Sequence, residues 1–251
     1  MKRSKKRISM LVATAAVIAV SIGATYAFLT SETDKLENTF TPSDNIQVEI
    51  QEPNWTGDKD DNNDGQSGKE KAEKYTPNIL IEKDPFLKNT TSSNSHNDEY
   101  VAMELDYYIQ DSAGKMQEVT YSEFKKIASV YSYNGTELVE GFSHTWKASP
   151  KFENGENDRF LYYGATGNLC ILPKNDTTIP LFDYVKINPE LKLKDQNGND
   201  VTITMKDVNG NSFTVKGMPK FEIDVKGFAV QADNITVDEA VTELINLMDN
   251  N

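Results

Sequence analysis

Apolar and polar residues alternate along much of this 251-residue chain, the pattern of β-strands that bury one face. In the longest such stretch the apolar residues are Val101, Met103, Leu105, Tyr107 and Ile109. Shorter alternating stretches lie at 46–50 and 221–225. The pattern predicts a mainly β protein with antiparallel strands.

Two Asn-Gly pairs mark tight turns between apolar stretches near the C-terminal end. Asn197-Gly198 separates residues 191–193 from 201–205, and Asn209-Gly210 separates the latter from 213–215. Asn and Gly tolerate the positive φ angles of hairpin turns. We therefore expect a three-stranded meander over roughly residues 190–216.

Helices are expected at only two places. Residues 122–128 form a short candidate with Ser122 as a cap. Thr236 and Glu239 have the spacing of a capping box. An apolar stripe at helical spacing then follows, at Val241, Leu244, Ile245 and Met248. The stripe predicts helix-on-sheet packing, with a partner-binding surface as the alternative.

The N-terminal region has the pattern of an export signal. Five basic residues precede an apolar run at 8–24, and the small residues Thr25 and Ala27 precede a candidate cleavage point before Phe28. An uncut membrane anchor is the alternative, although the run is shorter than the ~20 residues that span a bilayer. We expect residues 1–27 to be a signal peptide and the protein to be secreted.

Charge and cysteine content narrow the function further. The chain carries a formal charge of −13, and losing residues 1–27 removes five basic and no acidic residues, which gives −18. Such acidity argues against binding nucleic acid, whose phosphates require Lys and Arg clusters. The single cysteine, Cys170, lies in an apolar strand-like run and is expected to be a buried small hydrophobe rather than a reactive thiol.

The remaining chain is expected to form one domain over 45–251, preceded by an N-terminal segment at 28–44. Residues 56–74 are polar and acidic, and we expect a disordered insertion there. Within it, Asp60, Asn62 and Asp64 followed by Gly65 match the opening of a calcium loop. The twelfth position is Lys71 instead of Glu, so a solvated acidic linker is the alternative, and no other cofactor is expected.

Catalytic motifs are absent from the sequence. The two histidines, His96 and His144, do not form the His-Glu-x-x-His motif of zinc proteases. A Gly-x-Ser-x-Gly motif is also absent, and Cys170 has no histidine at a recognisable spacing. We expect the protein not to be an enzyme.

Several segments resemble the TasA/camelysin family of Gram-positive exported proteins. They are 23–30 around the cleavage point, 83–101 with Lys-Asp-Pro and Asp-Glu-Tyr-Val, 179–187 with Ile-Pro-Leu-Phe-Asp-Tyr-Val, and 228–233 with Phe-Ala-Val-Gln-Ala-Asp. The resemblance implies cleavage by a signal peptidase of the SipW type. Together with the strand pattern, it implies a jelly-roll-like β-sandwich with a few short peripheral helices.

The resemblance also implies a structural protein of the cell surface or biofilm matrix. Its subunits would assemble into fibres when the N-terminal segment of one copy adds as a strand to the next, with an accessory matrix protein as a further partner. Apolar side chains for the donated strand would come from Phe28, Leu29, Leu36 and Phe40. Alternatively, 28–44 completes the chain's own sheet.

Two other functions remain open. One is a monomeric extracellular module that binds a glycan or a protein through an aromatic platform. Its candidate residues are Tyr107, Tyr108, Tyr131, Tyr133, Trp146, Tyr162 and Tyr163. The other is a camelysin-like metalloprotease, which the missing zinc motif disfavours.

Overall fold

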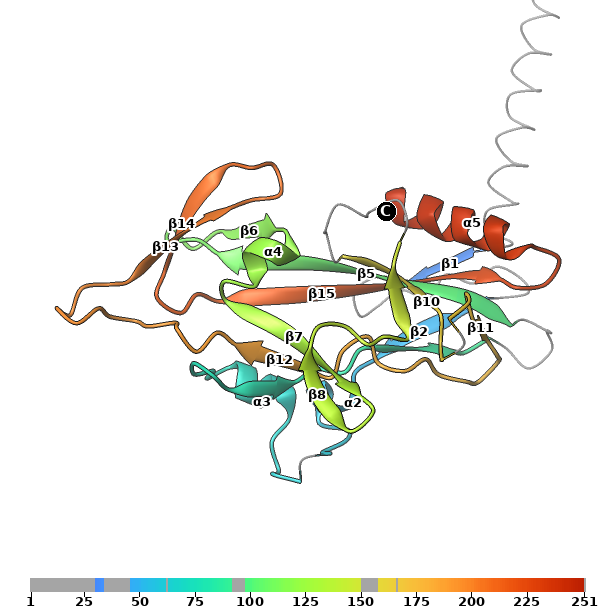
Figure 1. The fold of residues 1–251 in the computed structure, drawn as a ribbon, viewed down its shortest axis with the longest axis horizontal. Coiled ribbons are helices and arrows are strands. Elements are labelled where there is room, and N and C mark those ends of the chain that lie inside the picture. Colours follow the sequence, from blue (N-terminus) through green and yellow to red (C-terminus); the bar gives the residue numbers. More distant parts are fainter. Residues whose placement is uncertain are drawn as a thin grey trace, which may run out of the picture.

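The computed structural model describes residues 30–33, 46–61, 63–91, 98–149, 158–165 and 167–250 (Figure 1). Within these ranges the chain is mainly β, and each pair of neighbouring strands is antiparallel. Short helices lie between and after the strands. The expected fold class, an antiparallel mainly β protein with a few short helices, is confirmed.

A seven-stranded sheet forms the centre of the molecule. Its main order is β1 (Thr30–Thr33), β15 (Phe221–Gln231), β5 (Glu99–Gln110), β10 (Arg159–Tyr162) and β9 (Trp146–Ala148). Two more strands, β6 (Met116–Val119) and β11 (Ile171–Leu172), also pair with β5. The two longest strands, β5 and β15, pair along the full length of β15.

A second sheet lies across the core from the first. Its order is β3 (Leu80–Glu82), β12 (Tyr184–Ile187), β7 (Ala128–Asn134) and β8 (Glu137–Glu140). Two-stranded ribbons are formed by β2 (Val48–Gln51) with β4 (Phe86–Asn89), and by β13 (Thr202–Lys206) with β14 (Ser212–Lys216). The helices are α2 (Pro53–Thr56), α3 (Gly68–Ala72), α4 (Tyr121–Phe124) and α5 (Val237–Asp249).

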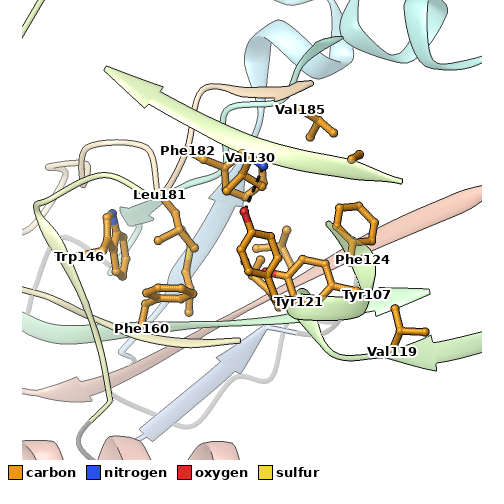
Figure 2. Close-up of a cluster of buried hydrophobic side chains, with 14 of the residues drawn as sticks. Tyr107, Val119, Tyr121, Phe124, Val130, Trp146, Phe160, Leu181, Phe182 and Val185 are labelled. Carbon is orange, nitrogen blue, oxygen red and sulfur yellow. Dashed lines mark hydrogen bonds between the residues drawn. The ribbon is translucent and has the colours of Figure 1, made fainter. Parts of the chain in front are cut away.

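The main core fills the space between the two sheets, and Figure 2 shows its aromatic centre. Tyr107 on β5 packs against Phe124 of α4, with ring centroids 4.9 Å apart. The Tyr121 hydroxyl accepts a hydrogen bond from the Val130 backbone N–H, which ties α4 to β7. The five alternating residues of 101–109 are all buried in this core, as their spacing predicted.

Helix α5 covers part of the opposite face of the central sheet (Figure 1). Leu244 and Met248 pack there against Phe228 and Val230 of β15. The capping box expected at Thr236 and Glu239 is present. Helix-on-sheet packing is therefore the correct interpretation of the C-terminal apolar stripe.

The predicted meander is only partly formed. The hairpin around Asn209-Gly210 joins β13 to β14, but residues 191–193 form no strand. A single bridge between Lys194 and Asp200 takes its place, and Leu193 is 62% exposed. The Asp195 carboxylate accepts two backbone N–H groups within this turn, and no neighbouring surface buries Leu193.

Two smaller expectations need correction. Helix α4 begins before Ser122, and its cap is Thr120, whose hydroxyl accepts from the Glu123 N–H. Cys170 is half-buried at the margin of the core and is not part of a strand, since β11 comprises only Ile171–Leu172. It still packs against the core as a small apolar residue.

The stretch 56–74 differs from the disordered insertion expected there. Its described residues contain α3, which begins with a capping box between Ser67 and Glu70. Ala72 packs on the main core beside Trp55, and Lys71 forms ion pairs with Asp64 and Glu82. Caps, ion pairs and a flanking tryptophan stabilise a segment whose composition alone offers little to bury.

Candidate functional site

The N-terminal strand β1 lies at one edge of the central sheet, beside the last strand, β15. Thr30 is opposite Val230, and Thr33 is opposite Gly227. The first described residues therefore complete the sheet of their own chain. This is one of the two roles considered for the N-terminal segment.

The described residues of β1 lie along one part of β15. β15 pairs with β5 from Phe221 to Gln231, but with β1 only from Gly227 to Val230. In the described part of the chain no strand pairs with this side of 221–226. An unpaired strand edge presents backbone N–H and C=O groups to any extended segment that approaches.

The direction of these backbone groups follows from strand alternation. The Lys220 carbonyl accepts from the Gln110 N–H at 2.8 Å, so it faces β5. The backbone groups of successive residues point to opposite sides of a strand. Those of Phe221, Ile223 and Val225 therefore point away from β5, toward the side on which β1 lies.

Side chains along the 221–226 part of β15 differ on its two faces. Val225 is buried in the main core. On the opposite face the Lys226 ammonium lies 3.2 Å from Glu104 and 3.1 Å from Asp106. Burial acts to lower the pKa of Lys226, but the two carboxylates outweigh it, and the pKa is raised overall. This part of β15 is thus anchored in the core on one face and in an ion-pair network on the other.

All six residues of the predicted assembly and cleavage sites lie outside the described ranges. They are Thr25, Ala27, Phe28, Leu29, Leu36 and Phe40. The structure therefore gives no contacts for them. Their neighbours at 30–33 are the part of the N-terminal segment that it brings to β15.

The predicted calcium loop has most of its polar groups engaged within the protein. Asp60 accepts hydrogen bonds from the backbone N–H groups of Asp64 and Gly65. The Lys71 ammonium lies 2.6 Å from Asp64, and hydrogen bonding to it lowers the pKa of the Asp64 carboxyl. Asn62 is outside the described residues, within which no group of three or more His, Cys, Asp or Glu side chains is placed to hold a metal ion.

The predicted aromatic platform is divided between core and surface. Tyr107, Trp146 and Tyr162 are buried in the main core, whereas Tyr133 is 46% exposed. Tyr133 forms an edge-to-face pair with Tyr184, their ring centroids 6.1 Å apart. His144, considered above for zinc, is exposed.

A cleft of about 530 Å³ lies beside Tyr133 and Tyr184. Its remaining lining residues are Asp64, Gln66, Lys71, Ile79, Leu80, Glu82 and Leu138. Sequence reasoning pointed to Tyr133 but missed the cleft, because its charged wall comes from two distant segments. The only sequence signal was the alternation of Tyr131 and Tyr133 on one strand face.

No family model, curated protein or solved structure matches this chain. Among the described residues, none of the helices has the length and apolar character required to cross a membrane.

Proposed function

We propose that this protein is an exported structural subunit of the cell surface or biofilm matrix that assembles by strand addition. The N-terminal strand of one copy would occupy β15 of the next. The observation that carries this proposal is the place of the N-terminal strand: β1 is an edge strand that pairs with β15 at 227–230, while β5 pairs with the other side of β15.

The exchange needs no new interface chemistry. A β1 strand from a second copy would form the same antiparallel ladder, with Thr30 opposite Val230. Exchange of an identical element between copies is a low-cost route to assembly, since the bonds lost in one chain are regained in the next. A longer donated segment would continue the same ladder past Gly227 along β15.

A reversible covalent lock tests the exchange directly. The backbone N–H and C=O of Val230 face β5, so Val230 and Thr30 are a non-hydrogen-bonded pair. The Cα atoms of such pairs lie roughly 4.5 Å apart, which is within the range that a disulfide can bridge. Thr30→Cys and Val230→Cys, combined with Cys170→Ala, should form an intrachain disulfide in the monomer. The oxidised monomer should then form no fibres, and reduction should restore them.

The same variant reports on assembled material. Fibres grown under reduction and then oxidised should give a ladder of covalent multimers on a non-reducing gel. Cys170→Ala alone is the matched control and should assemble without forming the ladder. Normal fibre growth from the locked monomer, seen by electron microscopy, would refute strand exchange.

A second test removes the donor segment. Deleting residues 28–40 from the chain that begins at Phe28 should abolish fibres while the domain stays folded by circular dichroism. Ile223→Pro should weaken elongation along this edge of β15, because it removes an N–H that points away from β5. Ile223→Ala, which loses the same side chain but keeps the N–H, is its control.

A further inference from the structure

The outer face of the second sheet carries a group of tyrosines above its core-facing residues. Val185, Val130 and Ile81 point into the main core. Their neighbours alternate to the outer face, and the strand register places Tyr184 beside Tyr131 and beside Glu82. On the next pair of strands, Tyr133 is opposite Leu138.

Residues 64–71 form one side of the cleft beside these tyrosines, which we call its wall. The Lys71 ammonium contacts Glu82 at 2.7 Å and Asp64 at 2.6 Å. The side chains of Lys71 and Glu82 are only 9% and 7% exposed. This buried pair, with Asp64 at its outer end, fixes the segment against β3, where α3 lies (Figure 1).

Close backbone packing holds the same wall. Gly68 lies so near β3 that a Cβ atom there would be 1.8 Å from the Glu82 carbonyl oxygen. This contact holds the 64–71 segment close to β3 at one side of the cleft. The cleft volume of about 530 Å³ is in the range of roughly 300–1,000 Å³ that small-molecule sites occupy.

The chemistry of the lining points to a neutral, polyhydroxylated ligand. The ring face of Tyr133 carries partial negative charge and attracts C–H bonds polarised by neighbouring hydroxyl groups. The Asp64 carboxylate, whose side chain is 44% exposed, accepts hydrogen bonds, while the Gln66 amide both donates and accepts. Because Lys71 compensates much of the carboxylate charge, a strongly charged ligand gains little from this cleft.

We propose that this cleft binds a short stretch of neutral glycan, which would give the protein a carbohydrate-binding activity separate from its assembly. A peptide is disfavoured because extended peptides take their affinity from backbone pairing along a strand edge. This cleft opens over the face of a sheet, where backbone groups are already paired between β3, β12 and β7. Tyr133 stacks on a sugar ring, and Asp64 and Gln66 bind its hydroxyl groups.

Isothermal titration of the purified protein with cellotriose, maltotriose and triacetylchitotriose tests the proposal. At least one of the three should bind with a dissociation constant in the roughly millimolar range. Tyr133→Ala should weaken that binding at least tenfold. Tyr163→Ala removes a half-buried tyrosine that packs on the α5 side of the central sheet and should leave binding unchanged.

Because Tyr133 is largely at the surface, its replacement should leave the fold intact, which circular dichroism checks. Absence of heat for all three sugars would overturn the proposal, as would equal affinity of Tyr133→Ala and the parent protein. Triglycine serves as a probe of peptide-backbone binding. Binding of triglycine in preference to every sugar would equally overturn it.

Discussion

Asp106 on β5 lies directly opposite Asp224 on β15, and the Lys226 ammonium is 3.1 Å from Asp106. Like charges opposite one another on paired strands destabilise a sheet. Lys226 offsets this repulsion in the part of β15 that lies beyond its ladder with the described residues of β1. The ion pairs therefore stabilise the strand on which the proposed assembly depends.

The first prediction concerns this lysine. Lys226→Met should reduce the free energy of unfolding by about 1–2 kcal/mol, since it removes the cation beside the half-buried Asp106, whereas Glu104 keeps its ion pair with Arg159. Urea unfolding measures the loss. A double-mutant cycle with Asp106→Asn should give a coupling energy above roughly 0.5 kcal/mol. Simple additivity of the two changes would show that the contact contributes nothing.

The second prediction concerns a buried acid, Glu99, whose Oε1 accepts hydrogen bonds from the Thr91 hydroxyl and the Gln47 N–H. Burial raises the pKa of Glu99 from 4.5 to about 8. Between these values the unfolded chain releases a proton that the folded chain retains. The stability of the protein should therefore fall as pH rises through this window and level off above it.

Glu99→Gln removes this titration while it keeps an acceptor oxygen. At pH 8 the variant should be more stable than the parent protein by roughly 1–3 kcal/mol, and at pH 4.5 the difference should be small. Urea unfolding at the two pH values decides the matter. Parallel pH dependence of variant and parent would contradict the burial of an ionisable group here.

The third prediction tests the docking of α3 on β3. Gly68→Ala should destabilise the protein by about 2–4 kcal/mol, or release the segment, because its Cβ would overlap the Glu82 carbonyl. Thermal unfolding and limited proteolysis within 56–74 report the two outcomes. Lys69→Ala, at the exposed neighbouring position, is the matched control and should behave as the parent. An unchanged melting temperature and an unchanged cleavage pattern would show that the close contact is absent.

The fourth prediction concerns the helix on the central sheet. Leu244→Ala should cost about 2–5 kcal/mol, because Leu244 is fully buried between α5 and β15. Glu243→Ala, at the neighbouring half-buried position, should change stability by less than ~0.5 kcal/mol. Chemical denaturation of both variants makes the comparison. Similar losses would mean that α5 is not docked on the sheet.

A fifth prediction follows from the net charge. A mature chain that lacks residues 1–27 carries −18, so copies repel one another at low ionic strength. Salt screens such repulsion over roughly 10 Å at 0.1 M. Light scattering should show faster assembly as ionic strength rises. A rate that is independent of salt would show that charge repulsion does not control assembly.

Local patterns predicted the elements whose stabilisation is local. The alternation at 101–109 indicated β5, and the Thr236–Glu239 pair indicated the start of α5, because both signals lie within a few residues. Leu193 shows the limit of such reasoning. Its apolar neighbourhood predicted a strand, but whether a strand forms depends on a partner surface that the local sequence does not specify.

The parts that sequence reasoning missed are non-local. Nothing near Lys71 indicates that its ammonium meets Glu82 in the next strand, so the 56–74 stretch was interpreted as disordered and the cleft was not foreseen. The pairing of β1 with β15 joins the two ends of the described chain. From the sequence alone, the N-terminal segment could pair either within its own chain or with another copy.

The pairing of β1 with β15 also affects the order of events during folding. Thr30 and Val230 lie 200 residues apart along the chain, so this ladder joins segments that are remote in the sequence. Contacts between remote segments form slowly, because the chain between them must first be brought into a closed loop. Pairing of β1 with β15 is therefore expected to be a late step when the chain folds.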